Sequence, residues 1–371
     1  MKTHNITSVL LLLALLFSTE LRADESIFSS YEQSGSAYFP CEYLQSCCLQ
    51  QSSWGTLSVF GEYLYWQPVV TGLPYSLTHT ILTVPFNPFG PENPFPDNLS
   101  DRNVKFGYGN GYRLGASYTV PETDWDFKVD YTQFDKKGRD SVMAGGEVFV
   151  DTLWDVLSAV VATEANAEMD VELKITNVTI GKTVPLGGCF KIRPNFGLQF
   201  FKLDCNENIQ YLGTTFVASI PQASTADIQL INDTNGWGLL AGFDATWELP
   251  WCFELFGQTN YGILRTSFSV SQNQQTEVTT QDTIVLTSTT HFTAILQSIQ
   301  AKGGLGWNYQ FQCCNHPFFL KLYAAYEMDL WLQNIQLSRM LSLGTGYSDA
   351  ITTNIGNVGF RGLSTGVQIT F

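Results

Sequence analysis

The chain has 371 residues, enough for one large β-barrel or for about two to three soluble domains. Charged residues make up 14% of it, against about 25% in ordinary soluble proteins, and aromatic residues make up another 14%. The formal net charge of −15 excludes nucleic acid as a partner, because phosphates require a basic surface. No internal run of about 18 apolar residues is present, so a helical membrane protein is excluded as well.

The first residues predict a signal peptide over residues 1–23. Lys2 and His4 give a weakly basic start, a short apolar run follows, and Leu21-Arg22-Ala23 provides a cleavage site. Export implies an oxidising compartment. Residues 24–55 carry three cysteines and no sustained period, and we expect them to form a periplasmic segment that precedes the folded domain.

From residue 56 to the end, apolar and polar residues alternate with the period of a β-strand. The clearest pair of strands runs from Tyr112 to Thr132 and turns at Pro121-Glu122-Thr123-Asp124, which predicts a hairpin. Further hairpins and single strands follow the same pattern, with turns at residues 185–188, 249–251 and 315–317 and single strands near 57–66 and 359–371. The sequence therefore predicts an all-β, antiparallel up-and-down transmembrane barrel over residues 56–371. We expect about ten strands, with twelve to sixteen left open.

The lengths of the links divide the predicted barrel into two rims. Four links are short turns, and five others run for about 25 to 40 residues each. These long links begin near Gln67, Asp135, Asp204, Arg265 and Leu332. Long and short links alternate, which is typical of outer-membrane barrels with short periplasmic turns and long extracellular loops. A soluble sandwich or propeller is the alternative, but it has no reason to sort its links by side.

The last strand ends on Phe371, with Leu363, Val367 and Ile369 on the same face. A terminal aromatic residue on an alternating strand resembles the signal that the barrel-assembly machinery recognises in bacterial outer-membrane proteins. We therefore expect outer-membrane lipid and this machinery as partners, and the cell outer membrane as the location.

Four segments resemble the Legionella-type major outer membrane protein family of pore formers, which also occurs in Chlamydia-like bacteria. They are Glu62-Tyr63-Leu64-Tyr65-Trp66-Gln67, Tyr112-Arg113-Leu114-Gly115 leading to Trp125-Asp126, Ile192 to Leu198, and Gly236-Trp237-Gly238 through Gly242-Phe243. The resemblance covers about Leu57 to Phe371 and implies an outer-membrane channel, without identifying a solute.

Cysteines gather on the side of the short turns. An exported protein with eight cysteines favours disulfides. Seven are candidates on this side: Cys41, Cys47, Cys48, Cys189, Cys252, Cys313 and Cys314. Intramolecular bridges are one interpretation. Bridges to neighbouring envelope proteins, or within a homo-oligomer, are the other, since adjacent cysteines rarely bond to each other.

Charged residues on the polar parity of the strands are the candidate lining of a pore. They are Arg113, Asp126, Lys128, Asp130, Glu172, Lys174, Lys191, Arg193, Lys321, Glu327 and Asp329. We expect an outer-membrane porin for small hydrophilic solutes or ions, whose wall sets its selectivity. A plugged structural or adhesive protein, cross-linked in the envelope, is the alternative. The four histidines form no catalytic arrangement and no metal or phosphate motif is present, so we expect no enzyme and no cofactor.

Overall fold

The computed structural model describes residues 55–80, 98–145, 148–152, 161–187, 189–217, 220–278, 284–313, 316–342 and 349–371. The predicted signal peptide and the cysteine-containing segment up to residue 54 lie outside the described residues, and both stay predictions. Within the described part of the chain, no helix is long and apolar enough to cross a membrane.

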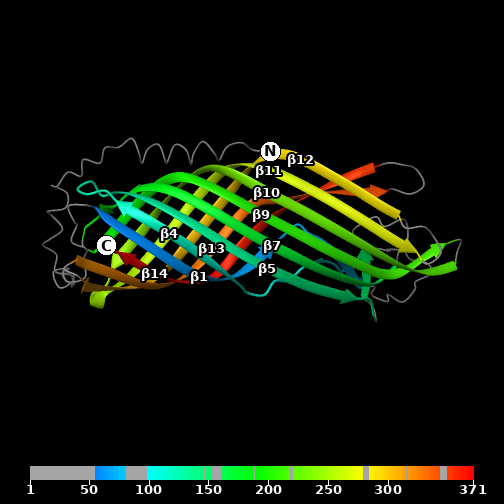
Figure 1. The fold of residues 1–371 in the computed structure, drawn as a ribbon. Coiled ribbons are helices and arrows are strands. Elements are labelled where there is room, and N and C mark those ends of the chain that lie inside the picture. The colour runs from blue at the N-terminus through cyan, green and yellow to red at the C-terminus, as the bar shows by residue number, and fades with distance from the viewer. Residues whose placement is uncertain are drawn as a thin grey trace, which may run out of the picture. The chain divides into compact units, whose positions relative to one another are not determined.

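Ten antiparallel strands form a closed barrel, as the alternation predicted (Figure 1). Each strand pairs with its neighbours, and β1 pairs with both β4 and β14, which closes the ring. The strands are β1 (Thr56–Val70), β4 (Gly109–Thr119), β5 (Trp125–Met143), β7 (Val161–Lys182), β9 (Phe190–Val217), β10 (Ile220–Glu248), β11 (Phe253–Val278), β12 (Ile284–Cys313), β13 (His316–Ser342) and β14 (Asp349–Thr370). Closure leaves no open sheet edge in the barrel, which a structure inside lipid requires.

Both ends of the barrel chain meet at one rim, which we call the short-turn end. Leu57 and Phe371 exchange two backbone hydrogen bonds of 2.9 Å there. The turns at this end include the short strand β8 (Val184–Pro185) and the 3₁₀ turn η2 (Pro250–Cys252). Trp251 and Cys252 both adopt positive φ angles in η2, which turns the chain sharply between β10 and β11.

The strands are much longer than the sequence predicted, and this changes the opposite rim, which we call the far end. Three of the five expected long loops, those beginning near Asp204, Arg265 and Leu332, continue as strand: β9 reaches Val217 and β11 reaches Val278. Beyond β1 and β5, the expected loops carry the additional strands β2 (Pro74–Thr80), β3 (Asn98–Asn103) and β6 (Val148–Thr152). The rims still differ, but mainly through strand length.

A band of apolar side chains faces outward next to the short-turn end. On β10 it runs from Trp237 to Trp247 and includes Leu239, which is 70% exposed, and Phe243. At about 3.3 Å per residue and a tilt of about 40°, this stretch rises about 25 Å, the thickness of a lipid-facing band. Apart from Leu240, the inward residues of the same stretch, such as Asp244, are polar or small.

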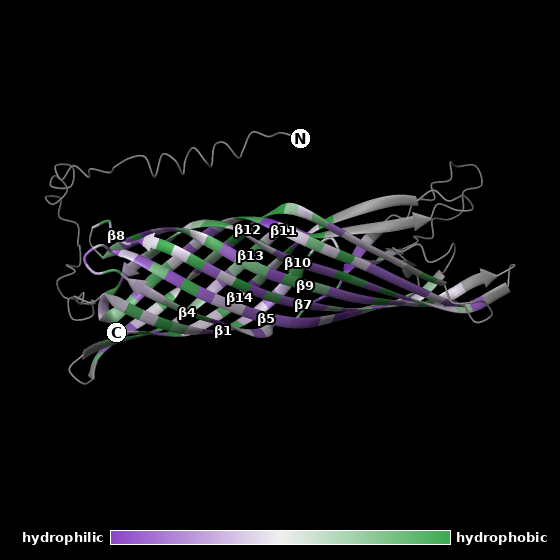
Figure 2. Cartoon of the chain, turned by 45° about the horizontal axis from the view of Figure 1, so that its top comes forward, coloured by the Kyte–Doolittle hydropathy of each residue, from purple (hydrophilic) through white to green (hydrophobic). Residues whose placement is uncertain are grey.

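The two faces exchange character beyond the band, in a region that we call the tower. On β7, Val178 and Ile180 face outward in the band, whereas Val171, Leu173 and Ile175 are buried inside the tower. The inward parity of β7 does not change between Ile175 and Asn177; only the residue types do. Figure 2 shows hydrophobic patches over the end that carries the C-terminus and hydrophilic strand surfaces toward the far end. The tower is therefore folded like a water-soluble barrel with an apolar core.

Candidate functional site

The interior of the barrel is the candidate site, and it begins with a charged chamber at the short-turn end. Two adjoining cavities of about 480 and 350 Å³ form it, and they share Arg193, Asp244, Lys321 and Thr370. Lys128 also lines the chamber, with its ammonium 5.1 Å from the centroid of the Phe60 ring. The wall therefore combines both signs of charge with aromatic faces.

Most charges of the chamber are neutralised by partners on other strands. Arg193 on β9 forms ion pairs with Asp126 on β5 and with Asp244 on β10, the latter at 2.8 Å. Lys191 pairs with Glu248 at 2.5 Å, and Lys321 pairs with Glu254. These pairs lower the cost of keeping charges inside the barrel.

A denser ionic layer, which lies on the far-end side of the chamber, closes it. Arg113 on β4 lies 2.6 Å from Glu62 and 3.0 Å from Glu327. Lys302 on β12 lies 2.6 Å and 2.7 Å from the same two carboxylates, and Tyr323 donates a 2.7 Å hydrogen bond to Glu62. The layer joins strands that are not neighbours in the sheet, because β13 and β14 separate β12 from β1.

Neutral groups continue this layer across the rest of the lumen. Ser298 on β12 donates to Gln199 on β9 at 2.8 Å, Gln199 donates to Asn177 at 3.0 Å, and Asn177 donates to Asp130 at 3.0 Å. Asp329 is almost completely buried beside the layer. The chain of hydrogen bonds spans from β12 to β5 and leaves little free volume, since the adjoining cavity measures about 40 Å³.

Above the ionic layer lies an apolar plug that the sequence analysis did not predict. Trp66, Phe134, Trp331 and Phe360 are each at most 1% exposed, with ring centroids 5.4 to 6.1 Å apart. The core cluster around them draws side chains from β1, β5, β7 and β9 to β14, nine of the ten barrel strands. Each fully buried side chain of this size contributes about 1.5–3 kcal/mol.

Nine of the eleven predicted lining residues face the interior. They are Arg113, Asp126, Lys128, Asp130, Lys191, Arg193, Lys321, Glu327 and Asp329. The prediction for Glu172 and Lys174 is wrong: they lie on the outer face of the tower and pair with each other at 2.5 Å. The reason is that β7 has left the lipid band at this height, so its apolar parity turns inward and its charged parity meets water.

Several interior partners were missed, including Glu62, Lys302 and Asp244. Parity could have revealed Lys302 and Asp244, since each shares a strand face mainly with small or polar residues. Glu62 instead shares its face with the apolar residues Phe60, Leu64 and Trp66. Their pairing could not be predicted, because the partners lie on strands far apart in the sequence.

The cysteines are placed unevenly. Cys189 and Cys252 lie at the short-turn end, and neither is a free thiol. Cys205 is a free thiol inside the tower, 2% exposed, and its burial, followed by the charge of Asp204, raises its pKa well above the usual range. Cys41, Cys47, Cys48, Cys314 and the side chain of Cys313 lie outside the described residues, so disulfide connectivity stays a prediction.

The sequence profile of the family described as Legionella pneumophila major outer membrane protein precursor matches residues 50–371. Among solved structures, the chain is similar to the outer membrane protease OmpT from Escherichia coli, with 10% identity, 87% of this chain and 99% of that chain covered, and a TM-score of 0.40. It is also similar to a major outer membrane protein from Thermus thermophilus, with 12% identity, 85% and 99% covered, and a TM-score of 0.30. No curated protein matches the chain.

Proposed function

The chain belongs to the family of the Legionella pneumophila major outer membrane protein precursor and is an outer-membrane barrel, and from this premise we propose a function. We propose that it is a structural, surface-exposed protein of the outer membrane whose lumen is closed at rest. Its short-turn end then faces the periplasm and its tower stands outside the cell.

The apolar plug is the observation that carries this proposal. Trp66, Phe134, Trp331 and Phe360 meet on one side of it, and Leu173 and Phe268 reach it from other strands. A hydrated ion that crossed this region would lose its water among side chains that cannot replace it. The ionic layer beneath adds a second barrier, since its carboxylates already have cationic partners.

A porin is the second candidate, and the charged chamber favours it. Its wall offers Arg193, Lys128 and Lys321 beside carboxylates, which is the kind of surface that sets ion preference in channels. Conduction would require the apolar plug to rearrange. A porin and a plugged barrel therefore differ in whether the resting protein conducts.

Single-channel recording of the refolded protein in a planar bilayer separates the two functions. We expect no steps from the wild type, and openings from a Trp66→Ala/Trp331→Ala variant that removes two rings of the plug. Tyr65→Ala is the matched control, because Tyr65 faces outward on the same strand. A heat-modifiability gel reports whether each variant folds. Stable, ion-selective steps from the wild type would overturn the proposal in favour of the porin.

The remaining expectations also stand as proposals. Phe371 is exposed at the periplasmic end beside Phe318, where the assembly machinery has access to it. Cys189 and Cys252 lie at the same end, but neither is free, so disulfides to envelope partners or to a second copy are proposed for the other candidate cysteines. Comparison of cell envelopes with and without reductant tests cross-linking, since the linked form shifts to the mass of the monomer. We also propose that the protein is not an enzyme.

A further inference from the structure

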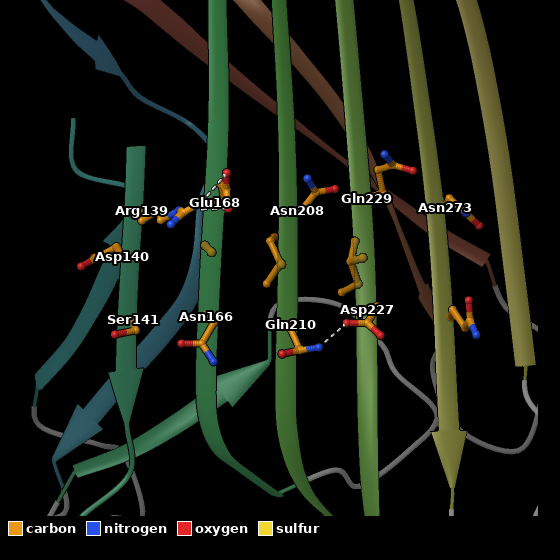
Figure 3. A pocket seen from close by; sticks show the side chains of 14 residues that line it. Arg139, Asp140, Ser141, Asn166, Glu168, Asn208, Gln210, Asp227, Gln229 and Asn273 are labelled. Carbon is orange, nitrogen blue, oxygen red and sulfur yellow. Dashed lines mark hydrogen bonds and ion pairs between the residues drawn. The ribbon is translucent and has the colours of Figure 1, made fainter. Parts of the chain in front are cut away.

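The outer wall of the tower carries a hollow whose lining is rich in side-chain amides. It measures about 800 Å³ and crosses β5, β7, β9, β10 and β11 (Figure 3). A second hollow of about 360 Å³ adjoins it toward the membrane and shares Glu168, Asn208 and Gln229 with it. The two form one elongated depression, which we call the amide hollow.

Strand register builds the amide hollow from two adjacent rows of polar side chains. One row places Asn208 opposite Glu168 and Gln229, and continues to Asn273. The next row places Gln210 opposite Asn166 and Asp227. Since alternate residues of a strand share a face, the outward members of both rows line the same surface.

Both cations of the hollow are paired with carboxylates that also line it. Arg139 lies 3.0 Å from Glu168, and Lys137 lies 3.2 Å from Asp170. Gln210 donates a 2.9 Å hydrogen bond to Asp227. The lining has five carboxylates and two cations, an acidic excess that disfavours phosphates and other polyanions.

Two amides at the centre of the hollow remain available. Within the described part of the chain, the side chains of Asn208 and Gln229 form no hydrogen bond, and both are exposed. Each amide offers two donors and a carbonyl acceptor. Groups that donate and accept side by side are complementary to hydroxyl groups, which do the same. The chemistry therefore fits a neutral, hydroxyl-rich chain.

The height of the hollow relative to the membrane indicates which hydroxyl-rich chain lies next to it. Lys174 and Lys202 lie opposite each other where the outward face turns from apolar to polar. On β10, Gln229 lies about 26 Å along the strand from Trp237, on its far-end side. The hollow thus faces sideways, just above the outer leaflet, where lipopolysaccharide presents its sugars. We propose that the amide hollow binds the saccharide chain of this glycolipid. The inference rests on the outer-membrane location and not on the closed lumen.

Calorimetric titration of the refolded full chain with core oligosaccharide, released from lipopolysaccharide by mild acid, tests the proposal. We expect binding by the wild type and a loss of affinity of about tenfold or more in an Asn208→Ala/Gln229→Ala variant. Asn235→Ala is the matched control, since Asn235 is an exposed amide on β10 outside the hollow, and it should bind as the wild type does.

Three results would overturn the assignment. They are no binding of the oligosaccharide, equal binding by the double variant, and binding of the lipid A fraction alone. The last result would place recognition at the phosphates. Channel recording is independent of this titration, so failure here leaves the proposed function untouched.

Discussion

The band and the tower are built from the same strands, yet each is the inside-out version of the other. In the band, Leu239 and Phe243 face lipid while Asp244 faces the chamber. In the tower, Leu173 and Ile175 fill the interior while Glu172 and Lys174 face water. The backbone does not distinguish the two regions, since the inward parity of β7 is the same in both. The solvent outside the barrel decides which residue type each face carries.

The comparison also shows two ways to fill a narrow barrel. The band fills it with charges that must find partners, and the tower fills it mainly with apolar side chains that need none. Removal of one charged partner leaves the others buried and unpaired, whereas removal of one apolar side chain leaves only a cavity. Substitutions in the ionic layer and in the tower core therefore test this difference.

The largest effect should come from Arg113→Met. This change leaves Glu62 and Glu327 inside the ionic layer with Lys302 as their shared cation, and we expect the protein to lose about 3–5 kcal/mol of unfolding free energy. Urea unfolding in detergent micelles measures it. Arg361→Met is the control, because Arg361 faces outward and should cost at most about 1 kcal/mol. Equal losses for both variants would show that the ionic layer contributes no more than a surface charge.

A pair of neighbours on β7 tests the tower. Leu173→Ala should cost about 2–5 kcal/mol, because Leu173 is fully buried in the core cluster. Lys174→Ala should cost about 0–1 kcal/mol, because Lys174 is a surface residue with a surface partner. The same urea titration serves for both variants. The alternation alone predicted that Lys174 faces the interior and that Leu173 faces outward. A larger loss of stability for Lys174→Ala than for Leu173→Ala would support that prediction and contradict the inward orientation of Leu173.

The alternation of β7 shows which features of the fold could be predicted from the sequence and which could not. It predicted a strand correctly, because period two is visible in Val171, Leu173 and Ile175. It assigned the wrong face, because alternation does not tell which side is wet. A clue was present: the apolar residues move to the opposite parity at Val178 and Ile180. When a strand keeps its register but its apolar residues change parity, its outer face has passed from lipid to water.

The site was predictable in part for a different reason. Period two placed Arg113 and Glu327 on inward faces, but not in contact, because they come from β4 and β13 and meet through barrel closure. The plug residues Trp66 and Phe360 were hidden for the same reason. Sequence gives the face of each strand, while closure and stagger decide which faces meet.

The smallest effect should appear at Asp233, on the outer face of the tower. Partial burial, followed by the charge of Asp204 opposite it, raises the pKa of Asp233 above its ordinary value of 3.8. A raised carboxyl pKa means that the fold favours the protonated form. This contribution to stability is therefore complete below about pH 3.8 and is lost as the pH rises through the folded-state pKa.

Asp233→Asn removes this loss, so its urea midpoint should exceed that of the wild type at pH 7, and the gap should close near pH 3. Asp227→Asn is the control. Asp227 accepts a hydrogen bond from Gln210, so removal of its charge should not raise the urea midpoint of the protein. A gap that is equally wide at both pH values would mean that the carboxylate row of Asp204 and Asp233 carries no electrostatic cost. Repulsion between the two carboxylates on the tower wall would then be screened as completely as it is between charges in water.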